Sequence, residues 1–146
     1  MRVVLQRVSR ASVTVGGDAV GSVGAGLVLL VGFTEGDSEE EVRWMADKIV
    51  GLRIFPDAHG LMNCSLDASR GDLLVISQFT LYGDTRKGKR PSFVKAAHPD
   101  VAVPLYERFL ELLRERAPGQ VESGVFGAHM EVELVNDGPV TLVLER

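Results

Sequence analysis

The stretch that decides the fold is Leu73-Leu74-Val75-Ile76-Ser77-Gln78-Phe79-Thr80, near the middle of a chain of 146 residues. Its first half is apolar without interruption, which predicts a buried strand. Its second half turns polar and leads into a glycine-containing loop with the basic residues Arg86, Lys87, Lys89 and Arg90. Because ligands collect beyond the carboxyl ends of parallel strands, Ser77–Thr80 is a candidate binding site. Ordinary polar residues at a strand end are the alternative.

The segments before this stretch show strand patterns and then a helix pattern. Strands are predicted at residues 2–8, 12–15, 19–23 and 27–31. Gly16-Gly17 predicts a tight hairpin turn between the second and third of these strands. A helix should follow, because Ser38 with Glu41 has the form of a capping box, although Asp37 with Glu40 offers a second register. Its apolar stripe consists of Val42, Met45, Ala46 and Ile49.

A short strand near residues 61–66 and a second helix are predicted on either side of the central stretch. The apolar residues with helical spacing are Leu105, Phe109, Leu112 and Leu113. This helix could begin at Pro99 or Asp100, but Pro104 would then fall in its second turn. The start of the second helix is therefore open.

The last quarter of the chain predicts a hairpin. Residues 130–134 and 140–144 alternate polar and apolar side chains around the turn signal Asp137-Gly138. Pro139 directly after that turn is unusual, because proline removes a backbone donor where the second strand would begin. A hairpin does not require a Gly-Pro pair, so the pair indicates that the backbone shape itself has a use.

Composition and length limit the classes of function. With 146 residues, 45% of them hydrophobic, a single domain over residues 1–146 is expected. No apolar run approaches the roughly 20 residues that span a bilayer, and no signal-peptide pattern opens the chain. The single cysteine, Cys64, is consistent with a reducing cytoplasm. A net charge of −4 argues against nonspecific coating of nucleic acid, while the basic loop is either a local phosphate contact or simply solvated.

Conventional catalytic sets are weak in this sequence. The three histidines, His59, His98 and His129, lack metal-ligand spacing, and one cysteine cannot supply a cysteine-rich metal site, so neither metal nor cofactor is expected. Ser77 or Thr80 could be a nucleophile, but the sequence identifies no base to activate either hydroxyl. The residues alone predict an α/β domain with a polar site at a strand end.

Two motifs together resemble the D-aminoacyl-tRNA deacylase family. They are Ser77-Gln78-Phe79-Thr80 and Asn136-Asp137-Gly138-Pro139-Val140-Thr141. The opening segment Leu5–Val13 and the segment Arg90-Pro91-Ser92-Phe93 are also similar to that family, so the resemblance covers essentially the whole chain. The expected fold is a single domain with mixed, mostly antiparallel β-sheets in β/β/α layers and two main helices.

The resemblance implies a homodimer that hydrolyses the ester between a D-amino acid and the terminal adenosine of tRNA. Ser77–Thr80 would line the reaction centre, with backbone amides near Gln78 and Phe79 stabilising the oxyanion. Gly138-Pro139, with a cis bond, would enter that site from the other subunit and leave no space for an L side chain. Glycine has no side chain to reject, so glycyl-tRNA is a further candidate substrate.

The remaining site residues follow from the same resemblance. Phe126 and Met130 would lie near the adenosine pocket, with core packing as the alternative for each. The basic loop, with Arg86, Lys87, Lys89 and Arg90, would contact tRNA phosphates. Two other classes of function stay open. One is a noncatalytic tRNA-binding module, and the other is a small-molecule esterase with a Thr80 or Ser77 nucleophile and a partner such as His129.

Overall fold

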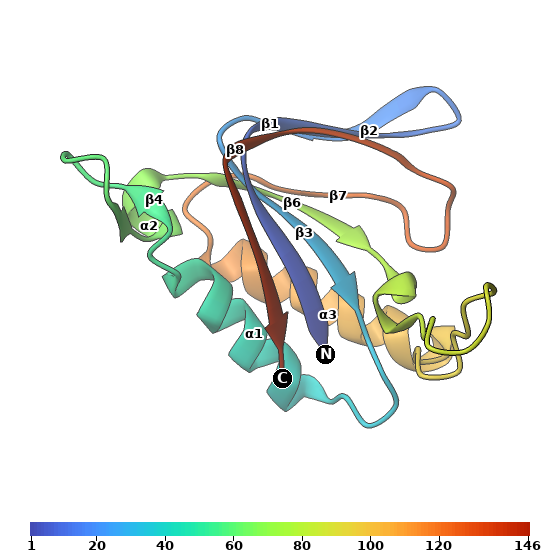
Figure 1. Ribbon diagram of the computed structural model, residues 1–146. Coiled ribbons are helices and arrows are strands. Elements are labelled where there is room, and N and C mark those ends of the chain that lie inside the picture. Colours follow the sequence, from blue (N-terminus) through green and yellow to red (C-terminus); the bar gives the residue numbers. More distant parts are fainter.

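The computed structural model describes residues 1–146, which fold around one bent, mixed sheet (Figure 1). Its strands are β1 (Arg2–Val15), β2 (Asp18–Val23), β3 (Gly26–Gly32), β6 (Asp72–Ser77), β7 (Val121–Ser123) and β8 (Glu131–Glu145). A small second sheet pairs β4 (Phe55–Pro56) with β5 (Met62–Cys64). The helices are α1 (Glu39–Gly51), α2 (Leu66–Ser69), α3 (Pro99–Arg116) and the 3₁₀ turn η1 (Phe79–Tyr82). The expected α/β fold, mostly antiparallel with two main helices, is confirmed.

Strand β1 organises the sheet. It pairs antiparallel with β3 through Arg2–Val8 and with β2 through Ala11–Val15, so the two strands predicted here form one long strand. The predicted turn between β1 and β2 is present, with positive φ angles at Gly16 and Gly17. Beyond β3 the pairing becomes parallel, from β3 to β6 and from β6 to β7. The carboxyl ends of these parallel strands therefore lie at one edge of the sheet.

The predicted terminal hairpin is wrong. Residues 131–145 form the single strand β8, which follows β1 along both of its parts (Figure 1). Arg10 pairs with Val135 and Gln6 with Thr141, and the register shifts between these pairs, so Asp137-Gly138-Pro139 forms a bulge instead of a reversal. The alternation on either side of the bulge is the same for a hairpin as for one interrupted strand. Pairing with β1 decides between them.

The bulge is closed by a side chain. The Oδ1 atom of Asn136 accepts a hydrogen bond from the Val140 amide at 3.0 Å, and its Nδ2 atom donates to the Thr141 hydroxyl at 3.0 Å. These contacts replace ladder bonds that the bulge interrupts. Gly138 has a φ of 130°, which L side chains rarely adopt. The Gly138-Pro139 bond is cis, as the resemblance implied.

Two hydrophobic clusters produce three layers. Along β6, Leu73 and Val75 belong to the main core under α1 and α3, while Leu74 and Ile76 belong to a smaller cluster on the opposite face. The smaller cluster is covered by the bent part of β1 and the first part of β8, with Val13 buried and Val132 partly buried against it. The central strand is thus buried on both faces. None of the helices is long and apolar enough to cross a membrane.

Helix α1 begins as its capping box predicts. The Ser38 hydroxyl accepts from the Glu40 amide at 3.2 Å, and the Glu41 carboxylate accepts from the Ser38 amide at 2.8 Å. The competing register is excluded, because the Asp37 carboxylate instead accepts from the Thr34 amide at 2.8 Å and pairs with the ammonium group of Met1 at 2.5 Å. The whole predicted apolar stripe of α1 is buried.

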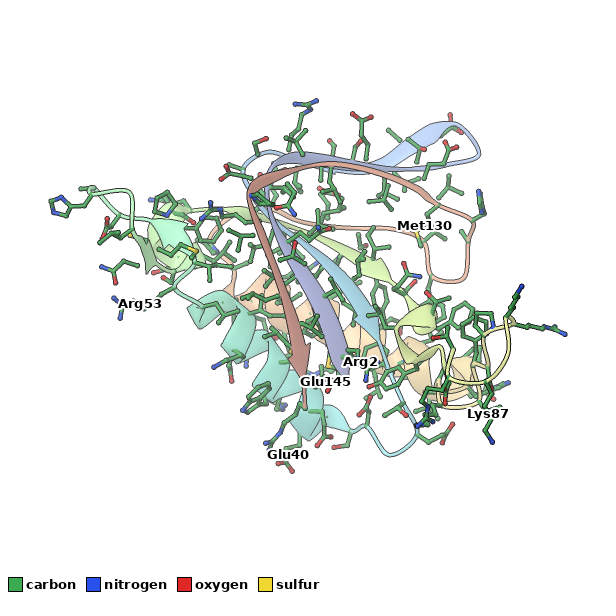
Figure 2. All side chains as sticks on the ribbon, in the orientation of Figure 1. Arg2, Glu40, Arg53, Lys87, Met130 and Glu145 are labelled. Carbon is green, nitrogen blue, oxygen red and sulfur yellow. The ribbon has the colours of Figure 1, made fainter.

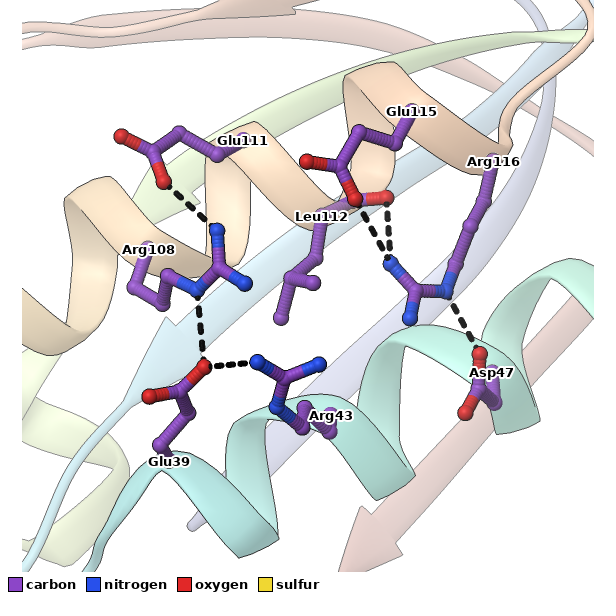
Figure 3. Close-up of polar contacts among 8 residues, drawn as sticks. All are labelled: Glu39, Arg43, Asp47, Arg108, Glu111, Leu112, Glu115 and Arg116. Atoms are coloured by element: carbon purple, nitrogen blue, oxygen red, sulfur yellow. Dashed lines mark hydrogen bonds and ion pairs between the residues drawn. The ribbon is translucent and has the colours of Figure 1, made fainter.

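Helix α3 begins at Pro99 and continues through Pro104, which settles the boundary that the sequence left open. Pro104 is exposed and lies in the second turn, so the helix loses one amide donor there and still continues to Arg116. Two ion pairs join α3 to α1, Arg108 to Glu39 at 3.0 Å and Arg116 to Asp47 at 2.6 Å (Figure 3). Exposed pairs of this kind add little to stability, so the two helices are held together mainly by their buried apolar stripes.

Candidate functional site

The turn after β6 is held against β3. The Gln78 amide donates to the Val31 carbonyl at 2.7 Å, and the Leu81 amide donates back to the Gln78 carbonyl at 3.2 Å. A Cβ atom on Gly32 would lie 2.9 Å from that Gln78 carbonyl oxygen, so glycine permits the close approach. The polar strand end predicted from sequence is therefore a 3₁₀ turn that rests on the neighbouring strand.

The far end of this turn is fixed by Arg2 (Figure 2). Its guanidinium donates to the Leu81 carbonyl, pairs with the Glu145 carboxylate, and lies over the Tyr82 ring at 4.9 Å from the centroid. Burial raises the pKa of Tyr82 to about 12. The turn thus has an anchor at each end, and its backbone is well placed to act as a rigid surface.

A cavity of about 600 Å³ opens beside this turn, at the carboxyl ends of β3 and β6. One wall is the turn itself, from Ser77 to Phe79; a second is the segment Phe126–Met130 between β7 and β8; a third is the start of α3 with Ala102. The lining is mostly apolar, which suits a small organic ligand with few polar anchors. The location is the one expected for ligands in sheets with parallel strands.

The structure brings together five of the residues predicted for the site. They are Ser77, Gln78, Phe79, Phe126 and Met130. Phe126 also packs against the main core and Met130 against the smaller cluster, so each residue lines the cavity and packs in the interior at once. Thr80 is exposed and lies outside the lining, with its hydroxyl bound by the Gln78 side chain. The Thr80 hydroxyl is therefore held beside the cavity and not within it.

Some lining residues were not predicted as site residues from the sequence. They include His98 and Phe93, whose ring meets the Phe79 ring edge-on at 5.2 Å between centroids. His129, the partner named for the esterase alternative, lines the cavity as well. Phe93 carries a sequence signal, since it ends the segment Arg90–Phe93 that resembles the family. The Nδ1 atom of His98 lies 3.2 Å from the Asp100 carboxylate and not beside Ser77. No group of acidic, cysteine or histidine side chains is arranged to hold a metal ion.

Gly138-Pro139 lies away from the cavity of its own chain, on the exposed bulge of β8. The bulge is supported from below by Arg7, the one charged residue in the buried set, which is 9% exposed. Its Nε atom donates to the Asp137 carbonyl at 3.1 Å, and its Nη1 atom donates to the Ile54 carbonyl at 2.5 Å. Gly138-Pro139 is therefore exposed to solvent, and the hydrogen bonds of Arg7 hold the backbone beneath it.

The basic loop is closed at its base by Asp84 and Ser92, whose backbones exchange hydrogen bonds of 2.7 and 2.9 Å. The Arg86 side chain binds Asp84 and holds the pKa of that carboxyl well below its ordinary value. The charge of Arg86 is thus already paired. The remaining three cations, Lys87, Lys89 and Arg90, are exposed and form no ion pair (Figure 2, where Lys87 is labelled).

The cavity is mostly apolar and lies at the ends of parallel strands, and the exposed cationic loop adjoins it at Phe93. These features define a class of α/β protein suited to binding the end of a polyanion. Comparisons with known proteins are more specific. The model of the D-Tyr-tRNA(Tyr) deacylase family matches residues 4–145. A D-aminoacyl-tRNA deacylase of Exiguobacterium sp. is 60% identical over 100% of this chain and 99% of the relative. One of Thermotoga petrophila is 57% identical over 99% and 97%.

Solved structures agree on the fold. A c-Myc DNA unwinding element binding protein superposes with a TM-score of 0.94 at 41% identity, over 100% of this chain and 99% of that one. A probable eukaryotic D-amino acid tRNA deacylase, at 23% identity, has a TM-score of 0.84 over 98% and 97%. The chain belongs to the D-Tyr-tRNA(Tyr) deacylase family.

Proposed function

We propose that this protein hydrolyses the ester bond of D-aminoacyl-tRNA to a free D-amino acid and tRNA. The observation that carries the proposal is the cavity in which the family-like segment Ser77–Phe79 meets Phe126 and Met130. The apolar walls suit the terminal adenosine, and the exposed cations Lys87, Lys89 and Arg90 suit the phosphates that precede it. A cytoplasmic location follows, because aminoacyl-tRNA is made and used there.

The backbone supplies the chemistry in this proposal. Water adds to the ester carbonyl, the ribose oxygen leaves, and a neighbouring ribose hydroxyl assists the water. The sequence pointed to amides near Gln78 and Phe79 as oxyanion donors. The Gln78 amide already donates to the Val31 carbonyl at 2.7 Å, so the Phe79 amide remains, and the adjacent Thr80 amide is added as a second donor. These open the 3₁₀ turn, where the first amides of a helix have no partner within it. Loss of one oxyanion donor typically costs about 2.7–4 kcal/mol.

Chirality is selected by the partner subunit of a homodimer. Gly138-Pro139 is exposed, rigidly based on Arg7, and outside the cavity of its own chain, which favours its insertion into the cavity of a second copy. Enantiomers have equal polarity and volume, so only shape around the α-carbon separates them. A main-chain wall beside that carbon excludes an L side chain and accepts glycine, which makes glycyl-tRNA a further substrate.

A noncatalytic nucleic-acid-binding module is the second candidate. The exposed cations favour it, and so does the name of the structural neighbour at 41% identity, a DNA unwinding element binding protein. It leaves the cavity and the outward bulge without a role. An esterase with a Ser77 nucleophile has less support, because the His98 ring pairs with the Asp100 carboxylate and not with the Ser77 hydroxyl. Cavity, bulge and family together favour the deacylase.

One assay separates these functions. The protein is incubated with D-tyrosyl-tRNA and with L-tyrosyl-tRNA, and loss of the ester is followed alongside salt-dependent binding of uncharged tRNA. Hydrolysis of the D ester alone supports the deacylase. Binding without turnover supports the module, and labelling of Ser77 or Thr80 by a covalent ester probe supports the esterase.

A further inference from the structure

A tyrosine in the core reaches the wall of the cavity from behind. Tyr106 lies on α3, 3% exposed, and its hydroxyl donates to the Val75 carbonyl at 2.9 Å. Burial raises the pKa of this phenol above its ordinary value, which favours the protonated, donating form. A phenylalanine would fill the same space without burying a polar group, so the hydroxyl calls for a reason beyond packing.

The carbonyl that Tyr106 binds has a second donor. The Gly124 amide donates to the same Val75 oxygen at 3.1 Å, and Val75 pairs with Ser123 at the last position of the β6–β7 ladder. Gly124 is where the segment that becomes the cavity wall leaves the sheet. A single oxygen atom therefore joins helix α3, the central strand and the base of that wall.

The Tyr106 ring contacts the same wall two residues further on. Its centroid lies 5.6 Å from the centroid of the Phe126 ring, at a tilt of 58°, within the range of favourable aromatic pairs. Phe126 also lines the cavity. The hydroxyl fixes the direction of the phenol ring, and the ring in turn limits where Phe126 can lie.

We propose that Tyr106 is a positioning residue for substrate binding, which holds Gly124 and Phe126 so that the wall Phe126–Met130 fits the terminal nucleoside. The proposal deepens the proposed function and rests on it. Tyr106 does not line the cavity, so it acts through Phe126 and not on the substrate. Its loss should therefore weaken binding and leave the rate of the bound substrate nearly unchanged.

Two variants and a control test this role. Tyr106→Phe removes only the hydroxyl, and Tyr106→Leu also removes the ring. Phe109→Leu is the matched control, because Phe109 is fully buried on the same helix and makes no aromatic contact with Phe126. The measurements are KM and kcat on D-tyrosyl-tRNA and the dissociation constant of adenosine. All are made at a temperature well below the Tm of each variant.

Tyr106→Phe should raise KM and the adenosine dissociation constant about three- to tenfold, the range set by one net hydrogen bond, with kcat within about twofold. Tyr106→Leu should raise both further, while Phe109→Leu lowers Tm and leaves them unchanged. Equal KM values for wild type and Tyr106→Phe, or equal increases in Tyr106→Leu and Phe109→Leu, would overturn the role. Wild-type protein that fails to hydrolyse D-tyrosyl-tRNA would overturn the proposed function, and adenosine binding alone would then decide the role of Tyr106.

Discussion

The hydroxyl of Thr80 is the most conspicuous reactive group in the motif, and its position argues against a catalytic part. It is exposed, outside the cavity lining, and hydrogen-bonded by the Gln78 side chain. We expect Thr80→Ala to keep substantial activity on D-tyrosyl-tRNA, within about tenfold of wild type, because the backbone amide at position 80 survives the change. Single-turnover hydrolysis measures this, with Thr80→Ser as control. Total loss in a folded Thr80→Ala protein would instead identify a hydroxyl nucleophile.

The two tyrosines of the chain provide a direct test of burial at the turn and behind the cavity wall. Burial raises the pKa of Tyr82 to about 12 and raises that of Tyr106 as well, against about 10 in an unfolded chain. These phenols contribute stability in full below about pH 10, and that stability is lost as pH rises through the folded pKa. Tyrosinate absorbance should thus stay low at pH 10 in folded protein.

The control for this titration is Tyr82→Phe. This variant leaves only Tyr106. Its ionisation should then occur at the same pH as unfolding, which is measured by circular dichroism. Two ionisations near pH 10 with the circular dichroism of the native state would show that neither ring is buried as described. The same titration would report on the contact between Tyr82 and Arg2 that fixes the turn.

Among the elements, the bulge of β8 depends most on one side chain. Asn136→Ala leaves the Val140 amide without its acceptor, and we expect a loss of about 1–2 kcal/mol in the free energy of unfolding. Urea denaturation measures the change. Asn136→Asp is the control, because it keeps an acceptor oxygen for the Val140 amide while it replaces the donor to Thr141 and adds one negative charge beside Asp137.

At the β8 bulge, the preference for D over L esters should fall together with the stability of the protein. If the bulge presents the chiral filter, Asn136→Ala should also lower the ratio of D to L hydrolysis, while Asn136→Asp retains most of it. A stable Asn136→Ala protein with unchanged selectivity would contradict the link between the bulge and Gly138-Pro139.

Sequence patterns within a short segment predict those helices and strands that depend on that segment alone. The capping box at Ser38 located the start of α1, and the apolar runs at 27–31 and 73–76 located β3 and β6. The hairpin predicted for the last quarter is wrong because its alternation of polar and apolar residues suits either a hairpin or one bulged strand. The choice depends on pairing with β1, whose partners are more than a hundred residues away in the chain. No local pattern contains that information.

The site was predictable to the extent that it lies in short motifs. Ser77–Phe79 was located by the end of an apolar strand, and Phe126 and Met130 through the family resemblance. The contributions of His98 and Ala102 were missed, because the start of α3 reaches the cavity only through packing on the sheet. Pro104 obscured even the beginning of that helix.

For the whole molecule, the bend of the sheet separates the cavity from Gly138-Pro139 within one chain and so favours a site shared between two. Mixed dimers test this. Ala128→Trp should block the cavity, and Gly138→Val should place a side chain in the filter, so each homodimer should be inactive. Mixing the two should restore roughly a quarter of wild-type activity, since half of the dimers are mixed and each has one intact site. No recovery after verified subunit exchange would show that each chain carries its own complete site.

The central claim is that this cavity releases D-amino acids from tRNA and rejects their mirror images. The most direct measurement is kcat/KM of the wild-type protein on D-tyrosyl-tRNA and L-tyrosyl-tRNA prepared on the same tRNA. We predict a D to L ratio of at least about 100, which corresponds to ~2.7 kcal/mol of steric exclusion in the transition state. Equal values for the two esters, or no hydrolysis of either, would contradict the claim.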